Sequence, residues 1–227
     1  MSSVHRRRFR LRQLPRLAAL LLLLAAPGAA TAQSCTRTLM ADVVAIDQVW
    51  FWNRLGAVQP QGMMYALRRD VVPISGNSLT AGNARLRPDK RPRPMVLRMN
   101  VGDCLRIQFQ NLLDPTRRDQ DQPNTRHASI HVIGLQLFGH INEDGSYVGQ
   151  NASSLVSPGQ SAIYTYYAER EGEHVLYSAG TTTGGQGNGG QIAAGLFGAV
   201  VVEPAGARWY RSQVSRADMD LVTSSTN

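Results

Sequence analysis

Histidine is the residue type in this chain best suited to metal chemistry, and four of the five histidines lie beyond the first 32 residues. His127 and His131 are four positions apart, which on a strand means one shared face but a separation of about 13 Å. This pair would chelate one ion only if His127 lay in a bend. His140 and His174 come later and can approach each other in the fold. We therefore take His131, His127 and His140 as the candidate metal ligands.

The surroundings of these histidines leave a second interpretation open. Glu143 and Asp144 would add oxygen donors near His140. Alternatively, His131 is a hydrogen-bonded histidine inside the fold and the others are surface residues. The sequence has no Gly-x-Ser-x-Gly or His-Glu-x-x-His motif, so we assign no catalytic residue and no organic cofactor.

The first 32 residues predict export. Six arginines precede an unbroken apolar run at 17–26, and Ala30-Thr31-Ala32 matches a cleavage signal. The run is too short to span a bilayer as a helix, so we expect a signal peptide and not an anchor. The mature chain should begin near Gln33 and be periplasmic or secreted.

The cysteines and the charge are interpreted for this mature chain. Cys35 and Cys104 are the only thiols, and an oxidising compartment favours one disulfide between them over two unrelated thiols. Six of the 24 basic residues belong to the leader, which leaves 18 against 16 acidic residues. That balance gives no support for nucleic-acid binding. The one remaining basic run, at 85–93, is interrupted by prolines and predicts a solvated, extended loop.

Short apolar or alternating runs separated by Gly and Pro turns predict an all-β chain. The expected strands cover residues 39–46, 95–100, 104–110, 129–137, 161–168, 174–177 and 196–203. Such a pattern favours a sandwich, with a small barrel as the alternative. Residues 50–65 predict a loop or short helix over one end of the core. Residues 181–190 predict a Gly-rich loop between strands.

Eight segments, in order, resemble the amino-terminal plastocyanin-like (multicopper oxidase type 3) domain of the multicopper oxidases, the laccase-like family. They are VGDCLRI at 101–107, QNLL at 110–113, SIHVIGL at 129–135, DG at 144–145, VSPGQ at 156–160, YTY at 164–166, GEHVLYS at 172–178 and GLFGAVVV at 195–202. The resemblance implies a Greek-key β-sandwich of cupredoxin type over residues 94–206. Around this domain we expect the signal peptide at 1–32, an N-terminal strand and loop extension at 33–93, and a polar linker, interrupted at its end, at 207–227.

The copper ligands of the family carry over poorly. Two His-x-His pairs of this domain help to bind a three-copper cluster in the family. Here the first pair keeps His131 but has Ile133, and the second pair is replaced by Tyr177 and Ala179. The sequence also lacks a Cys flanked by His with a downstream Met, the set that builds a blue-copper site.

Two functional interpretations follow from the resemblance. In the first, the chain is the amino-terminal domain of an exported multicopper oxidase, its partners are the further cupredoxin domains of that oxidase, and the isolated chain is inactive. In the second, it is an exported cupredoxin-like protein without copper ligands that serves as a binding or scaffolding module. A small metal-binding protein that uses His131 is a third, weaker fit. None of these involves nucleic acid, or a membrane after signal cleavage.

Overall fold

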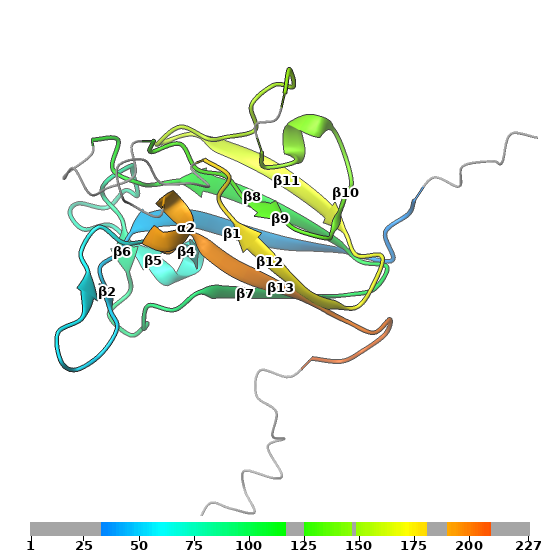
Figure 1. Ribbon diagram of the computed structural model, residues 1–227, viewed down its shortest axis with the longest axis horizontal. Coiled ribbons are helices and arrows are strands. Elements are labelled where there is room, and N and C mark those ends of the chain that lie inside the picture. Colours follow the sequence, from blue (N-terminus) through cyan, green and yellow to red (C-terminus); the bar gives the residue numbers. More distant parts are fainter. Residues whose placement is uncertain (1–32, 117–124, 147–148, 181–189, 210–227) are drawn as a thin grey trace, which may run out of the picture. The chain divides into compact units, whose positions relative to one another are not determined.

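The computed structural model describes residues 33–116, 125–146, 149–180 and 190–209 (Figure 1). The chain divides into two compact units, Met1–Ser34 and Cys35–Asn227, and every element below belongs to the second. Among the described residues, no helix is long and apolar enough to cross a membrane.

The first layer is a five-stranded sheet in which an N-terminal strand is parallel to a strand from the middle of the chain. β1 pairs in parallel with β8 on one side and antiparallel with β4 on the other, while β11 and β10 extend the sheet beyond β8. The order across the sheet is β10 (Gln136–Leu137), β11 (Ser161–Tyr167), β8 (Cys104–Asn111), β1 (Thr38–Asp47) and β4 (Met63–Leu67).

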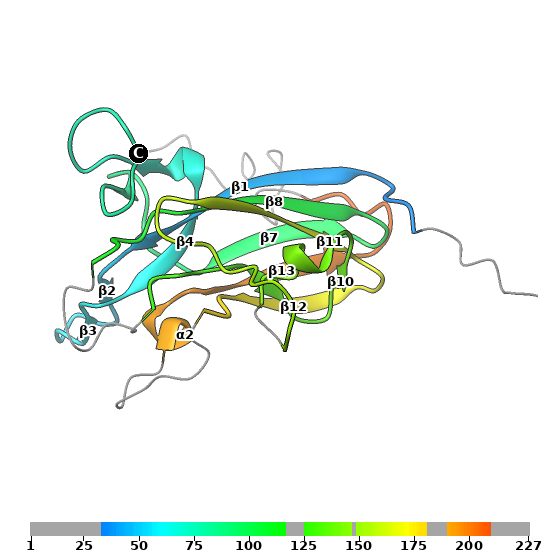
Figure 2. The ribbon, with the colours of Figure 1, turned by 90° about the horizontal axis from the view of Figure 1, so that it is seen from above.

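The second layer is a four-stranded sheet. Its β13 pairs in parallel with β7 and antiparallel with β12, which in turn pairs with the short strand β9. The order is β7 (Met95–Asn100), β13 (Phe197–Glu203), β12 (Gly172–Tyr177) and β9 (His131–Val132). In Figure 2 the layer that contains β1 and β8 lies above the layer that contains β12 and β13.

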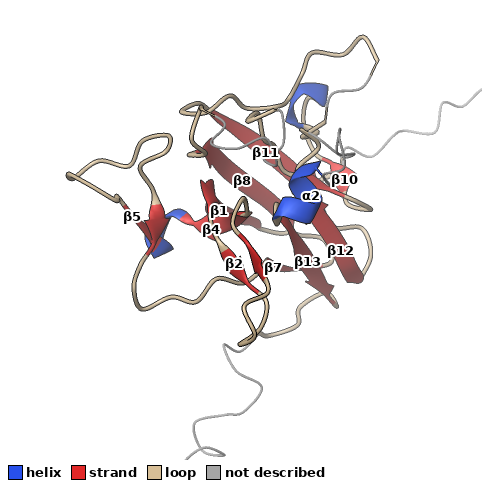
Figure 3. Ribbon diagram, turned by 60° about the vertical axis from the view of Figure 1, so that its left-hand side comes forward, coloured by secondary structure: helices blue, strands red, loops and turns tan. Residues whose placement is uncertain are grey.

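The remaining elements are short, and little of the described chain is helical (Figure 3). Two small hairpins pair β2 with β3 and β5 with β6. These elements are β2 (Trp50–Phe51), β3 (Val58–Gln59), η1 (Arg68–Asp70), β5 (Val71–Val72), β6 (Arg85–Leu86), η2 (Ile141–Glu143) and α2 (Gly190–Ala194).

The core lies between the two sheets because the strands alternate. Along β8, Leu105, Ile107 and Phe109 are buried while the residues between them face outward. These side chains belong to one apolar cluster with Leu176 of β12 and Val200 of β13. The prediction of an all-β sandwich is therefore confirmed.

The structure corrects sequence-based predictions about three segments. Residues 63–67 form β4, a strand, where a loop or short helix was expected. Four of its five residues are buried, so it lacks the period-two signal of a half-buried strand. The strand expected at 129–137 is split into β9 and β10, with a turn at Gly134, whose φ of 84° favours glycine. Of the expected loop at 181–190, residues 181–189 lie outside the described residues, and Gly190 instead begins α2.

The entry to β8 is fixed to the N-terminal segment. Cys35 and Cys104 form a disulfide with their Cα atoms 5.4 Å apart. Beside it, the buried carboxylate of Asp103 accepts hydrogen bonds from the Arg37 Nε at 2.9 Å and from the Asn100 backbone N–H at 2.8 Å. Covalent and polar contacts therefore hold the start of β1 beside the start of β8.

Candidate metal centre

The pairing of β9 with β12 brings two of the family's ligand positions face to face. In this antiparallel register Tyr177 lies directly opposite His131. The two rings are 5.5 Å apart between centroids and meet edge to face, at 78°. The carry-over of ligand positions from the family therefore places at least these two side chains at one site.

The imidazole of His131 is oriented by the Asp-Gly turn. Its Nδ1 lies 2.7 Å from the backbone carbonyl oxygen of Asp144 and 3.6 Å from that residue's carboxylate. A carbonyl oxygen only accepts, so Nδ1 carries the proton and Nε2 keeps the lone pair that a metal would use. The turn needs Gly145, because φ is 78° there and a Cβ would come within 1.9 Å of the Ile130 carbonyl oxygen.

The donor set at these positions does not fit a copper cluster. His131 supplies one imidazole and Tyr177 one phenol, whereas Ile133 and Ala179 have no donor atom in their side chains. A multicopper cluster needs several imidazoles that converge. Among the described ranges, no three His, Cys, Asp or Glu side chains gather closely enough to hold a metal ion.

The other candidate histidines each have their own local partner. The ring of His127 lies 3.3 Å from the Thr125 hydroxyl, and the ring of His140 accepts a hydrogen bond from the Asn142 backbone N–H at the start of η2. His174 Nδ1 donates to the Ile133 carbonyl oxygen at 3.0 Å. None of these contacts joins one histidine to another, and a role for His127 and His140 as ligands stays a prediction.

A buried polar network that the sequence did not reveal supports the same strands. The Ser178 hydroxyl donates to the Gln191 side-chain carbonyl at 2.5 Å and accepts from the Ser129 backbone N–H at 3.1 Å. The Gln191 amide nitrogen in turn donates to the backbone carbonyl oxygens of Thr125 and His127. Ser129 and Ser178 flank the ligand positions in sequence, so this network ties α2 to both ligand-bearing segments.

Three tyrosines pack beneath this region with their hydroxyls hydrogen-bonded. Tyr65, Tyr164 and Tyr166 donate to the backbone carbonyl oxygens of Ser129, Ser154 and Ile130. Burial raises the pKa of each of the three phenols above its ordinary value. All three are therefore neutral donors at physiological pH.

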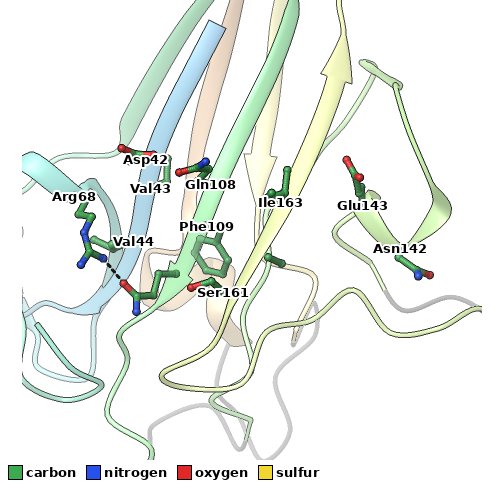
Figure 4. Close-up of a pocket in the computed structure, with 12 residues that line it drawn as sticks. Asp42, Val43, Val44, Arg68, Gln108, Phe109, Asn142, Glu143, Ser161 and Ile163 are labelled. Carbon is green, nitrogen blue, oxygen red and sulfur yellow. Dashed lines mark hydrogen bonds between the residues drawn. The ribbon is translucent and has the colours of Figure 1, made fainter. Parts of the chain in front are cut away.

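One hollow on this unit lies away from the histidines. It has a volume of about 750 Å³ and lies on the outer face of the five-stranded sheet. Figure 4 shows Asp42, Gln108 and Ser161 along the strands, and Glu143 at the right of the view. Arg68 is hydrogen-bonded to the side chain of Gln110. No histidine lines this hollow, so it does not extend the candidate metal centre.

The comparison with solved structures gives low sequence identities. A multi-copper oxidase from Pseudomonas thermotolerans is 22% identical over 77% of this chain and 31% of its own length, with a TM-score of 0.44. A copper nitrite reductase from Nitrosomonas europaea is 17% identical over 75% of this chain and 43% of its own, with a TM-score of 0.45. Another multicopper oxidase is 22% identical over 76% of this chain and 45% of its own length, with a TM-score of 0.42. The chain thus spans less than half of each.

The family assignment rests on sequence. No curated protein matches the chain. The multicopper oxidase family pattern matches residues 89–207, just over half of the 227 residues. The match covers the segments that carry the resemblance described above, and the predicted fold class, an all-β Greek-key sandwich of cupredoxin type, is confirmed. The chain belongs to the multicopper oxidase family.

Proposed function

We propose that this chain is the amino-terminal cupredoxin-like domain of an exported multicopper oxidase. The family match at 89–207 supports this assignment, as does the fact that the chain spans 31% of the Pseudomonas thermotolerans oxidase. In this proposal residues 1–32 are a cleaved signal, 33–93 an N-terminal extension, 94–206 the cupredoxin-like domain and 207–227 a linker. The partners are further cupredoxin domains of the same oxidase.

The isolated chain, in this proposal, has no oxidase activity. The observation that carries this point is the pairing of His131 with Tyr177 where the family places two imidazoles. Copper would supply electron transfer and oxygen chemistry in the family, and this chain's own residues offer it one oriented imidazole nitrogen. Any copper that binds here therefore binds weakly, through Nε2 of His131.

Copper titration of the mature chain tests this proposal. Residues 33–227 are loaded with Cu(II), and the visible spectrum, the electron paramagnetic resonance signal and oxygen uptake with a phenol and with Mn(II) are recorded. We expect no intense blue band, because that band needs a Cys thiolate on copper, and no turnover. His131→Ala should remove the weak copper signal, whereas the control His174→Ala should keep it. A blue band or catalytic oxygen uptake would contradict the proposal.

Restoring the missing ligands tests the position of the site independently of activity. The triple variant Ile133→His, Tyr177→His, Ala179→His places imidazoles at all four family positions. It should bind Cu(II) more tightly than the parent chain and show nitrogen coupling from more than one imidazole. If the triple variant binds no better than the parent, the residue-by-residue correspondence with the family is wrong at these strands.

A further inference from the structure

A second hollow opens at the side of the sandwich, between the two sheets. It has a volume of about 510 Å³ and lies where β4, the last strand of the five-stranded sheet, faces β7, the last strand of the other. The loop that leads into β7 covers it, and it shares Asp70 and Lys90 with an adjoining hollow of about 500 Å³. We call these two connected spaces the basic hollow.

The lining of the basic hollow is strongly cationic. Six basic side chains line it against a single carboxylate, that of Asp70. They are Arg69, Arg87, Lys90, Arg91, Arg93 and Arg98. The chain beyond the leader is close to neutral, at 18 basic against 16 acidic residues, so this concentration is not a reflection of the composition.

Several of these cations have no counter-ion. Lys90 pairs with Asp70 at 3.0 Å, Arg87 pairs with Asp89 at 3.0 Å, and Arg98 reaches Glu203 only at 3.8 Å. Among the described residues, Arg91 and Arg93 make no hydrogen bond and no ion pair. Both guanidinium groups belong to the lining of one hollow, and each is free to bind an anion in the paired geometry that guanidinium favours.

The loop that presents these cations is held in place. The Arg87 backbone N–H donates to the Asp70 carbonyl oxygen, and the Lys90 backbone N–H donates to the Arg87 carbonyl oxygen, each at 2.9 Å. Prolines at 88, 92 and 94 further restrict the backbone. The basic run was predicted to be a solvated, extended loop. Its first two residues instead form β6, and Arg87 and Lys90 tie the turn that follows to Asp70 of η1.

Part of the wall of the basic hollow is apolar. Leu67 of β4, Leu86 of β6 and Val96 of β7 line it and keep exposed apolar surface, because the first two are only partly buried and Val96 is 56% exposed. Its volume lies within the range of small-molecule sites, which join an apolar wall to a few placed polar groups. A simple anion would leave that wall uncovered, and a neutral apolar molecule would leave the guanidinium groups unpaired.

We propose that the basic hollow binds a small organic anion, that is, an apolar body with a carboxylate, phosphate or sulfate group. The body packs against Leu67, Leu86 and Val96, and the anionic group pairs with Arg91 and Arg93. This binding site is separate from the candidate metal centre and does not depend on copper.

Matched ligands test the proposal on the mature chain. The probes are 2-naphthoate and naphthyl phosphate, with 2-naphthamide as the neutral isostere and acetate as the anion without a body. Calorimetry should show binding of 2-naphthoate and naphthyl phosphate, and at least tenfold weaker binding of 2-naphthamide and acetate. A tenfold change in Kd corresponds to the loss of about one charge-assisted hydrogen bond. Methyl resonances of Leu67, Leu86 and Val96 should shift on binding, which reports the location.

Charge-matched variants separate a built site from general attraction. Arg91→Gln/Arg93→Gln should weaken binding of 2-naphthoate about tenfold or more. The control Arg54→Gln/Arg106→Gln removes the same net charge from exposed positions outside the hollow and should leave binding unchanged. Equal weakening by both variants, equal binding of 2-naphthamide, or no methyl shift would overturn the proposal.

Protection of the strand edges is the alternative role for Arg91 and Arg93. Cations at edge strands can serve to prevent pairing with another sheet. If no probe binds and Arg91→Gln/Arg93→Gln makes the chain dimerise, these arginines protect the edges of β4 and β7, and the proposed ligand site is wrong.

Discussion

Gln191 offers the sharpest test of the packing around the ligand-bearing strands. Its side chain is fully buried and makes three hydrogen bonds, one from the Ser178 hydroxyl and two to the backbone carbonyl oxygens of Thr125 and His127. Gln191→Leu keeps a similar volume and removes all three. The Ser178 hydroxyl is then buried without an acceptor, while the two carbonyls are partly buried and retain access to water.

The expected loss of stability in Gln191→Leu follows from the hydrogen-bond partners that Gln191 leaves behind. A buried group left unsatisfied costs about 1–3 kcal/mol. With one fully buried hydroxyl and two partly buried carbonyls, we expect Gln191→Leu to lower the free energy of unfolding by about 2–4 kcal/mol. Urea denaturation of the mature chain, followed by circular dichroism, measures it. The control Gln108→Leu, on the exposed side of β8, should stay within about 0.5 kcal/mol of the parent.

A double-mutant cycle checks the physical cause. Ser178→Ala removes the hydroxyl that Gln191→Leu would otherwise leave unsatisfied. The double variant should therefore cost less than the sum of the single variants, by about 1 kcal/mol or more. Strict additivity, or a loss below about 0.5 kcal/mol for Gln191→Leu alone, would refute the reasoning that this network stabilises the site.

Three further outcomes are expected. Thiol labelling of the denatured, unreduced chain should find neither Cys35 nor Cys104 free, and reduction should cost about 4 kcal/mol, because the bond closes a loop of 69 positions. The contribution of Tyr65, Tyr164 and Tyr166 to stability should be constant below about pH 10 and fall above it, by up to about 1.4 kcal/mol per pH unit for each phenol. Buried phenols stay protonated in the folded chain after unfolded ones ionise. The urea midpoint should therefore be lower above about pH 10 than below it, and this difference should be smaller in Tyr164→Phe. Intact mass of exported material should show a chain that begins near Gln33, and retention of residues 1–32 would contradict export.

The strands that the sequence predicted well are those with one buried and one exposed face. β8 was found within one residue of its end because Leu105, Ile107 and Phe109 alternate with polar residues. β4 was missed since both of its faces are covered, which leaves no periodic signal. The break between β9 and β10 depends on one glycine conformation, which periodicity does not report.

The contacts around His131 could be predicted only in part from the sequence, and its role as a metal ligand stays a prediction. The family resemblance placed His131 and Tyr177 at one site, and the strand register brings them together. The network of Ser129, Ser178 and Gln191 joins residues about 50 and 62 positions apart, so no local pattern announces it. The basic hollow likewise forms only when β4 and β7 come to lie at facing edges of different sheets.

The two parallel strand pairs have a consequence for how this chain reaches its native state. β1 can pair early with β4, because Asp47 meets Met63 only 16 positions away. Its parallel partner comes much later, since Thr38 pairs with Cys104, and β7 pairs with a strand 103 positions further on, as Met95 does with Gly198. High contact order of this kind slows folding to milliseconds or longer. In that interval the open backbone edges of β1 and β7 are available to other chains, so aggregation competes with folding and chaperone binding should raise the yield of native protein.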